Sequence, residues 1–331
     1  MIDVFAHFLT APVMSALEHH RPAFVATPNI RGRRALWNLE DRFRITDSYE
    51  GYRQVLSLAL PAIVEWAPED QIRPLVRASN DAMAEIVANH PDRFAGFVAE
   101  VGLPDVDLAL EEAHRAIDVL GAVGVQIYTN AAGHPLDEDR FVPFFDEMAR
   151  IGRPIWVHPT RTPDTPDYAS EDASRYMMWQ KIGWPYDTTV FMARLVYSGL
   201  FRRHPDLEIV THHGGGLVPH LAGRLRLHHE SPEMQRALGI PEDMTADEVI
   251  AGYQRFYGDT VFSGAAHPLT CTLEFFGVDR VLFATDMPFG AEGGDLFVRE
   301  SIAAVESRVT DAADRMAILE GNARRLLRLE A

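Results

Sequence analysis

Short apolar runs alternate with helical segments along almost the whole of this chain. Most of these runs are apolar throughout, instead of alternating with polar residues. Strands of that kind are typical of a parallel sheet that helices cover on its faces. The predicted strands comprise residues 2–7, 54–63, 94–101, 123–128, a run that ends at 158, a run that ends at 213, 261–265 and a run that ends at 286.

The segments between the runs mostly repeat apolar residues with a helical period. The predicted helices comprise residues 72–90, 104–120, 139–151, 188–203, 217–229, 270–277, 297–309 and 311–328. Two stretches lack this pattern, residues 10–50 and residues 160–184. Long irregular stretches in a compact domain are usually functional. We therefore expect residues 10–50 to form an insertion or cap, and residues 160–184 to form a lid loop.

Two α/β architectures fit this alternation, a barrel and a doubly wound open sheet. An open sheet would normally carry a glycine-rich phosphate-binding turn after its first strand. The sequence His7-Phe8-Leu9-Thr10 is not such a turn. A chain of 331 residues is also an ordinary length for one barrel. The prediction is a single domain over residues 1–331, folded as a distorted (β/α)8 TIM barrel.

Four of the apolar runs end in histidine or aspartate. The first ends at His7, the fifth at His158, the sixth at His212-His213 and the eighth at Asp286. The carboxyl ends of barrel strands meet at one mouth, where barrel enzymes keep their chemistry. Two imidazoles and a carboxylate, from His7, His158 and Asp286, suit one divalent metal with open positions, Zn²⁺ first and Mn²⁺ second. The alternative is a hydrogen-bonded His–Asp cluster without metal.

The histidine pair at the end of the sixth run precedes three glycines, residues 214–216. Successive residues of a strand point to opposite faces, so one histidine should face the cavity and the other away from it. We expect His213 to transfer protons and His212 to be a supporting, hydrogen-bonded residue. The catalytic residues predicted on this basis are His213 and Asp286.

Composition limits the partners and the location of the protein. The net charge of −17 disfavours nucleic acids and anionic membranes as partners. No apolar run approaches the roughly 20 residues of a membrane span. The single cysteine, Cys271, cannot form an internal disulfide, which fits a reducing compartment. We expect a cytoplasmic protein that acts on a small molecule.

Several motifs, taken in their order along the chain, resemble those of the amidohydrolase superfamily. They are Asp-x-x-x-His at 3–7, Trp-Val-His-Pro at 156–159, His-Gly-Gly-Gly-x-x-Pro at 213–219 and Ala-Thr-Asp-Met-Pro-Phe-Gly at 284–290. They are most similar to the branch with aminocarboxymuconate semialdehyde decarboxylase and γ-resorcylate decarboxylase. The resemblance implies metal ligands at His7, His158 and Asp286, an acid–base role for His213 and a homodimer. Arg224 matches an arginine that follows the glycine run, and we expect it to bind substrate.

Position 5 departs from the pattern that the resemblance implies. Relatives have histidine or glutamate there, whereas this chain has Phe5. The change removes one ligand and lowers the expected metal affinity and occupancy. An apolar Phe5, together with Trp179 in the aromatic-rich lid, suits an aromatic or conjugated substrate, although lid aromatics also serve to pack a loop onto a barrel.

Three functions remain open from the sequence. The first is a non-oxidative decarboxylase of an aromatic or conjugated carboxylic acid with a mononuclear metal site. The alternative is a metal-dependent hydrolase of a lactone, amide or carbon–carbon bond. The third is a barrel without activity that binds a ligand, which only Phe5 supports. The fourth run ends without the lysine that dinuclear relatives carboxylate, so a mononuclear site is favoured.

Overall fold

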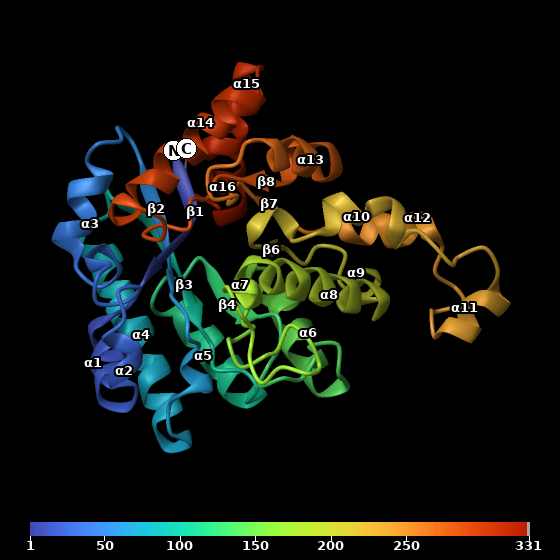
Figure 1. The fold of residues 1–331 in the computed structure, drawn as a ribbon, viewed down its shortest axis with the longest axis horizontal. Coiled ribbons are helices and arrows are strands. Elements are labelled where there is room, and N and C mark those ends of the chain that lie inside the picture. Colours follow the sequence, from blue (N-terminus) through green and yellow to red (C-terminus); the bar gives the residue numbers. More distant parts are fainter. Residues whose placement is uncertain (330–331) are drawn as a thin grey trace.

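The strands of the structure, a computed structural model that describes residues 1–329, form two parallel groups (Figure 1). The first six strands make one sheet in sequence order, and the last two make a pair. They are β1 (Ile2–Phe8), β2 (Arg53–Leu58), β3 (Phe94–Glu100), β4 (Gly124–Tyr128), β5 (Ile155–His158), β6 (Ile209–Thr211), β7 (Gly258–Asp259) and β8 (Val281–Leu282).

Backbone contacts at two seams join these groups into a closed barrel. Val210 of β6 pairs in parallel with Tyr257, and Ala6 of β1 pairs in parallel with Met287. At the second seam, the amide of Val4 donates to the carbonyl of Phe283 at 3.0 Å. The predicted barrel is therefore confirmed. It is distorted because β6, β7 and β8 are only two or three residues long.

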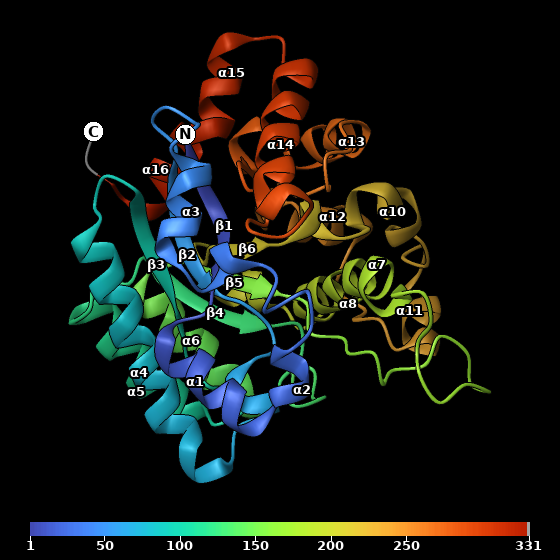
Figure 2. The ribbon, with the colours of Figure 1, turned by 60° about the vertical axis from the view of Figure 1, so that its left-hand side comes forward.

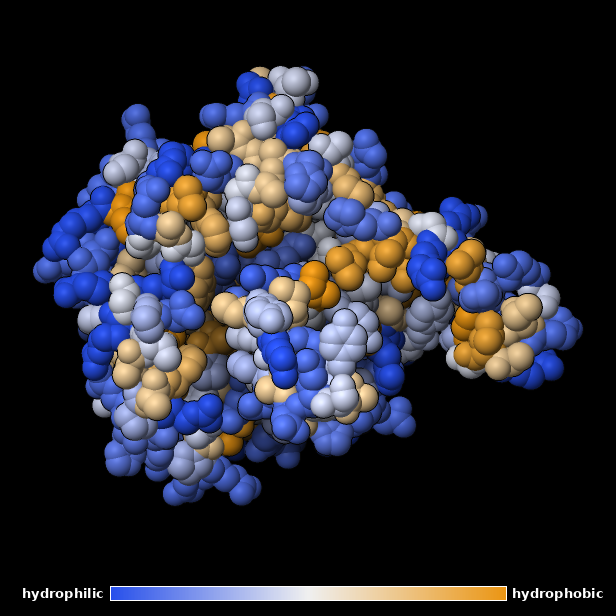
Figure 3. All heavy atoms as spheres, in the orientation of Figure 1, coloured by the Kyte–Doolittle hydropathy of each residue, from blue (hydrophilic) through white to orange (hydrophobic). Residues whose placement is uncertain are grey.

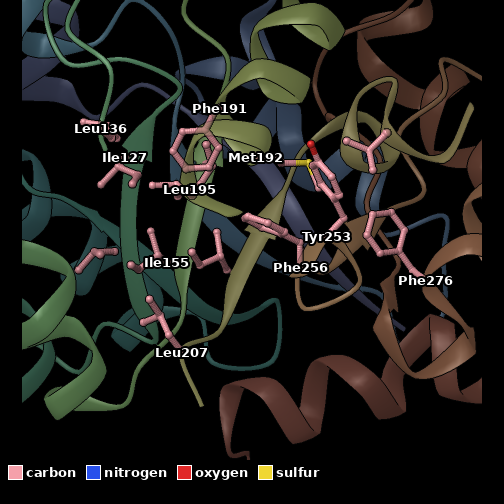
Figure 4. Close-up of a cluster of buried hydrophobic side chains, with 14 of the residues drawn as sticks. Ile127, Leu136, Ile155, Phe191, Met192, Leu195, Leu207, Tyr253, Phe256 and Phe276 are labelled. Atoms are coloured by element: carbon pink, nitrogen blue, oxygen red, sulfur yellow. The ribbon is translucent and has the colours of Figure 1, made fainter. Parts of the chain in front are cut away.

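Helices surround the barrel and bury the outward residues of its strands. On β4 and β5, the alternate residues Val125, Ile127, Ile155 and Val157 belong to the large outer core, whose packing against Phe191 and Leu195 is drawn in Figure 4. The residues between them, such as Trp156, then face the barrel interior. The surrounding helices include α4 (Glu69–Asn89), α5 (Val106–Asp118), α6 (Val142–Ile151), α8 (Gly183–Tyr197), α9 (Leu200–Arg203), α10 (Val218–Leu225), α12 (Ala246–Tyr253), α13 (His267–Phe276), α14 (Asp295–Arg308), α15 (Ala312–Met316) and α16 (Asn322–Leu327).

Residues 10–50, which lack a regular sequence pattern, contain three helices. These are α1 (Ala11–His20), α2 (Pro22–Val25) and α3 (Leu39–Thr46), which Figure 2 shows beside the first strands and α4. Val13 and Leu17 of α1 pack in one apolar cluster with Val76 of α4, and Phe43 of α3 packs against another cluster that includes Met83 of α4. This segment therefore lies as a folded cap on one side of the barrel.

The predicted seventh strand, residues 261–265, is wrong. The strand is β7 (Gly258–Asp259), and the residues after it turn. Ser263 and Gly264 have positive φ angles of 51° and 86°, which no strand accommodates. The seventh strand therefore ends at a carboxylate, that of Asp259. The second strand was also predicted too long, since β2 ends at Leu58 and a short 3-10 helix, Ile63–Glu65, follows.

Another predicted helix ends early, and the segment predicted as a lid loop contains little regular structure. The helix predicted over 217–229 ends at Leu225, and a further helix, α11 (Pro232–Leu238), follows it and projects from the body of the molecule (Figure 1). Residues 160–184 are irregular apart from α7 (Met178–Lys181) and the start of α8. Among the described residues, no helix combines the length and apolar character needed to cross a membrane.

Candidate metal centre and active site

Histidines and carboxylates from five strands meet at the mouth of the barrel. The side chains of His7 and Asp286 approach each other, with 3.1 Å between Nε2 and Oδ1. His212 Nε2 lies 3.5 Å from the same carboxylate oxygen. The ring of His158 is centred 5.1 Å from that of His7 and 5.2 Å from that of His212. The structure thus brings together the predicted residues His7, His158, His213 and Asp286, and it adds His212 and Asp259.

Three of these imidazoles are held by hydrogen bonds on the same ring nitrogen. His158 Nδ1 donates to the carbonyl of Pro159 at 2.6 Å, and His212 Nδ1 donates to Asp259 Oδ2 at 2.6 Å. His7 Nδ1 lies 3.1 Å from the hydroxyl of Ser57. Metal-binding histidines usually have one ring nitrogen held in this way, which orients the other nitrogen toward the cation.

The opposite nitrogens of these rings suit a divalent metal. Nε2 of His7 and Nε2 of His212 are buried without a hydrogen-bond partner, which is costly unless another group satisfies them. One ligand atom from each of His7, His158 and His212 lies within 4.8 Å of the others, and the same holds for His212, His213 and Asp286. The residues present therefore fit a cation bound by nitrogen and oxygen ligands.

The end of β8 is held in an unusual conformation. Asp286 has a φ of 64°, uncommon for a residue other than glycine, and its amide donates to the carbonyl of Phe5 at 3.1 Å. The preceding residue, Thr285, donates from its hydroxyl to the buried carboxylate of Asp3. Tyr52 donates to the same carboxylate. This buried network fixes the direction in which the Asp286 carboxylate points.

Burial and the neighbouring charges set the protonation of the cluster. Burial alone would raise the pKa of Asp286, but the close approach of His212 and His7 brings that pKa below its ordinary value. Burial lowers the pKa of His7 and of His158. In His212, burial is outweighed by Asp259 and Asp286, which raise its pKa to about 9. Without a cation, the Asp286 carboxylate is thus ionised and balanced mainly by His212.

His213 lies in the same site as His212, so the expected alternation of the pair is wrong. β6 ends at Thr211 and His213 has a φ of 56°, so the alternation of a strand does not extend to this residue. Its ring is centred 5.9 Å from that of Trp184 and 6.5 Å from that of His158, and its Nδ1 is buried without a partner. Burial, followed by the charge of His212, lowers the pKa of His213 to about 3. The ring is therefore neutral and can accept a proton.

Aromatic rings surround the cluster. Phe5 stacks on His212, with ring centres 4.0 Å apart and planes inclined by 22°. Trp184 lies edge-on to His158, with ring centres 5.3 Å apart. Trp179 of the predicted lid lies edge-on to Trp184, with ring centres 5.4 Å apart. Of the predicted substrate-binding residues, Phe5 thus lies in the cluster. Trp179 does not contact the histidines directly, but it packs against Trp184, which contacts His158. Arg224 is exposed on α10, and within the described chain no contact links it to the histidines.

Three histidines of the cluster are buried in this conformation. The exposed fractions of His7, His158 and His212 are 3% or less. A cavity of about 200 Å³ lies nearby, between the loop after β4 and α8, and its lining includes Thr129, Asp187 and Arg194 but none of the cluster histidines. Asp286 and His213 are partly exposed, so the cluster is open to solvent on their side.

Sequence reasoning missed two residues of the site, Asp259 and Ser57. Asp259 follows Tyr257 and Gly258 at a strand end, as the other acidic and basic groups follow their strands. Placing the seventh strand too late in the chain concealed this signal. Ser57 lies inside β2, where a buried serine carries no distinctive pattern.

A closed β/α barrel whose strand ends present oriented histidines and a carboxylate defines a metal-dependent barrel enzyme. The chain belongs to the amidohydrolase family, since the family model described as Amidohydrolase matches residues 2–329. The γ-resorcylate decarboxylase of a Polaromonas species is 30% identical over 313 residues, which cover 91% of this chain and 90% of that protein. These findings confirm the family that the motifs indicated.

Solved structures of similar proteins agree with this assignment. The 2,6-dihydroxybenzoate decarboxylase from Rhizobium superposes with a TM-score of 0.82 at 26% identity, over 100% of this chain and 99% of that one. A dihydroxybenzoic acid decarboxylase from Polaromonas, solved with manganese and the inhibitor 2-nitroresorcinol, gives a TM-score of 0.79 at 27% identity. That comparison covers 100% of this chain and 97% of the other.

Proposed function

We propose that this protein is a metal-dependent, non-oxidative decarboxylase of an aromatic or conjugated carboxylic acid. The observation that carries the proposal is the convergence of His7, His158 and Asp286 at the barrel mouth. Nε2 of His7 is buried there without a hydrogen-bond partner and faces the carboxylate of Asp286. Relatives that match nearly the whole chain are decarboxylases of hydroxylated benzoic acids, which supports this substrate class.

His7, His158 and Asp286 would hold the cation. When bound, a divalent cation orients the substrate carboxylate or a neighbouring phenolic oxygen and stabilises negative charge on it. The imidazole-rich set favours Zn²⁺ over Mn²⁺, whereas the Polaromonas relative was solved with manganese. Zn²⁺ is our first choice and Mn²⁺ our second.

The protein supplies the proton for the reaction. In the proposed step, the neutral His213 first takes up a proton from solvent and then delivers it to the ring carbon that bears the carboxylate. The bond from that carbon to the carboxylate then breaks, its electron pair restores the aromatic ring, and CO2 leaves. The low pKa of His213 makes its protonated form a strong acid, and the ionised Asp286 nearby stabilises that form until transfer.

Residues 160–184 would act as the lid over this reaction. This segment lies over the site, since its Trp179 contacts Trp184, and Trp184 in turn packs against the buried His158. Phe5 and Trp179 offer apolar faces to an aromatic substrate. Arg224 stays a predicted substrate-binding residue.

The proposal is tested with purified protein loaded with Zn²⁺ or Mn²⁺ and a panel of hydroxybenzoic acids. Release of CO2 with the matching decarboxylated product is expected, and His213→Ala and Asp286→Ala should each lose the activity while keeping a wild-type far-UV spectrum. The exposed His134→Ala is the matched control and should keep full activity. Incorporation of ¹⁸O from water into the product would instead support the alternative, a hydrolase.

We also propose a homodimer. Ile182 just before α8, and Tyr186 and Val190 within it, are exposed at four-residue spacing, and Leu227, Met234 and Leu238 are exposed around α11. Figure 3 shows apolar colouring along the side from which α11 projects. Light scattering should give twice the 37.1 kDa mass of one chain. A mass of one chain at micromolar concentration would contradict the dimer.

A further inference from the structure

Phe5 and His212 lie in contact at the centre of the site, although they come from different strands. Phe5 of β1 occupies the position where a metal ligand is expected, and its phenyl ring offers no ligand atom. The ring of His212, which follows β6, stacks on it at 4.0 Å. An imidazole therefore lies beside the position from which the ligand is missing.

His212 shares with His7 the features expected of a metal-binding ring in this site. It is 0% exposed, its Nδ1 is held by Asp259 at 2.6 Å, and its Nε2 is buried without a hydrogen bond, 3.5 Å from Asp286 Oδ1. Its neighbour His213 differs, because Nδ1 of that ring has no partner to fix the ring's direction.

We infer that His212 is itself a metal ligand, which replaces on β6 the ligand that β1 has lost at Phe5. The cation would then be bound by His7, His158, His212 and Asp286. Phe5 acts as a positioning residue that supports the flat face of the new ligand, and Asp259 fixes its rotation. His213 is left free for proton transfer.

The relocated ligand also bears on which cation the site selects. A site with three neutral imidazoles and one carboxylate carries a single negative charge. Nitrogen ligands suit Zn²⁺ better than Mn²⁺, which prefers oxygen ligands. The inference rests on the metal centre of the proposed function but not on the decarboxylation itself.

The first test measures metal affinity in the absence of substrate. Dissociation constants for Zn²⁺ and Co²⁺ would be obtained by competition with a chromophoric chelator. His212→Ala should weaken binding by more than tenfold, and Asp259→Asn by about 10- to 100-fold. The exposed His134→Ala is the control and should change the constant by less than twofold. Equal constants for wild type and His212→Ala would overturn the inference.

A second variant separates ligation from folding. Phe5→His in the His212→Ala background returns a ligand to β1 and should recover most of the lost affinity, with melting temperatures monitored for every variant. X-ray absorption of the Co²⁺-loaded wild type should count three imidazoles. A count of two would overturn this inference and leave the proposed decarboxylation standing. A wild type that binds no divalent cation would overturn both this inference and the proposed metal centre.

Discussion

The guanidinium of Arg42 lies fully buried beneath the end of β1, where its Nη1 donates to the carbonyl of His7 at 2.9 Å. The same nitrogen donates to the carbonyl of Ala35, and Nε donates to Gln54 Oε1 at 2.7 Å. Burial lowers the pKa of Arg42 to about 10, so the group is still charged at neutral pH. One side chain of the cap thus holds the strand that carries a metal ligand.

Replacing Arg42 with methionine should destabilise the protein by about 3 kcal/mol. The apolar replacement fills much of the space but leaves buried acceptors on His7, Ala35 and Gln54 without a donor, at about 1–3 kcal/mol each before relaxation. Urea unfolding followed by circular dichroism measures the change. Arg44→Met, on the exposed face of the same helix, should shift stability by no more than about 0.5 kcal/mol. Equal effects of the two variants would show that the buried contacts add nothing.

The glycine after the histidine pair is required by its conformation and its surroundings. Gly214 has a φ of +65°, and a Cβ there would lie 2.3 Å from the ring of Phe262. Gly214→Ala should therefore cost more than about 2 kcal/mol, from overpacking and backbone strain together. Gly223→Ala in α10 meets nothing within 4 Å and should stabilise by up to about 1 kcal/mol. Thermal unfolding should show a lower melting temperature for Gly214→Ala and an equal or higher one for Gly223→Ala.

The barrel and most of the site could be predicted because their signals are local in the sequence. A buried strand that ends in histidine or aspartate is visible as an apolar run followed by one polar residue, as at His158 and Asp286. In a barrel such ends must converge, so residues far apart in the chain could be placed together.

The remainder depended on tertiary contacts that the sequence does not display. The orientation of His212 follows from a carboxylate on another strand, Asp259, and from the positive φ of His213. Alternation along a strand predicts neither. The cap helices form because their apolar residues pack against α4. Residues 10–50 have no regular apolar period from which these helices could be predicted.

Glu100 should make the metal-free protein less stable as the pH rises. Burial raises the pKa of this carboxyl from 4.5 to about 7, even though the hydroxyl of Tyr128 donates to it. Between these two pH values the folded state binds more protons than the unfolded state, so the free energy of unfolding falls as pH increases from about 4.5 to about 7. The full loss from this group is about 3 kcal/mol.

Glu100→Gln should remove this contribution because an amide does not ionise. Denaturant unfolding at pH 5 and pH 8, with chelator present, should show a smaller difference for the variant than for the wild type. Some slope should remain, since burial also raises the pKa of Asp3 to about 6. Glu85→Gln, on an exposed position of α4, should leave the wild-type slope unchanged. An unaltered slope in Glu100→Gln would mean that Glu100 ionises normally.

Ser57→Ala should weaken metal binding without unfolding the protein. The hydroxyl of Ser57 lies 3.1 Å from His7 Nδ1 and helps to orient that ring, so its removal leaves the ligand free to rotate. Loss of such an outer hydrogen bond typically lowers metal affinity by 10- to 100-fold, and because serine and alanine differ by one oxygen, we expect a change near tenfold here. Chelator competition measures it, with Ser307→Ala on α14 as the control, whose hydroxyl contacts only a helix carbonyl. An affinity equal to that of the control would show that His7 is held by the packing around it.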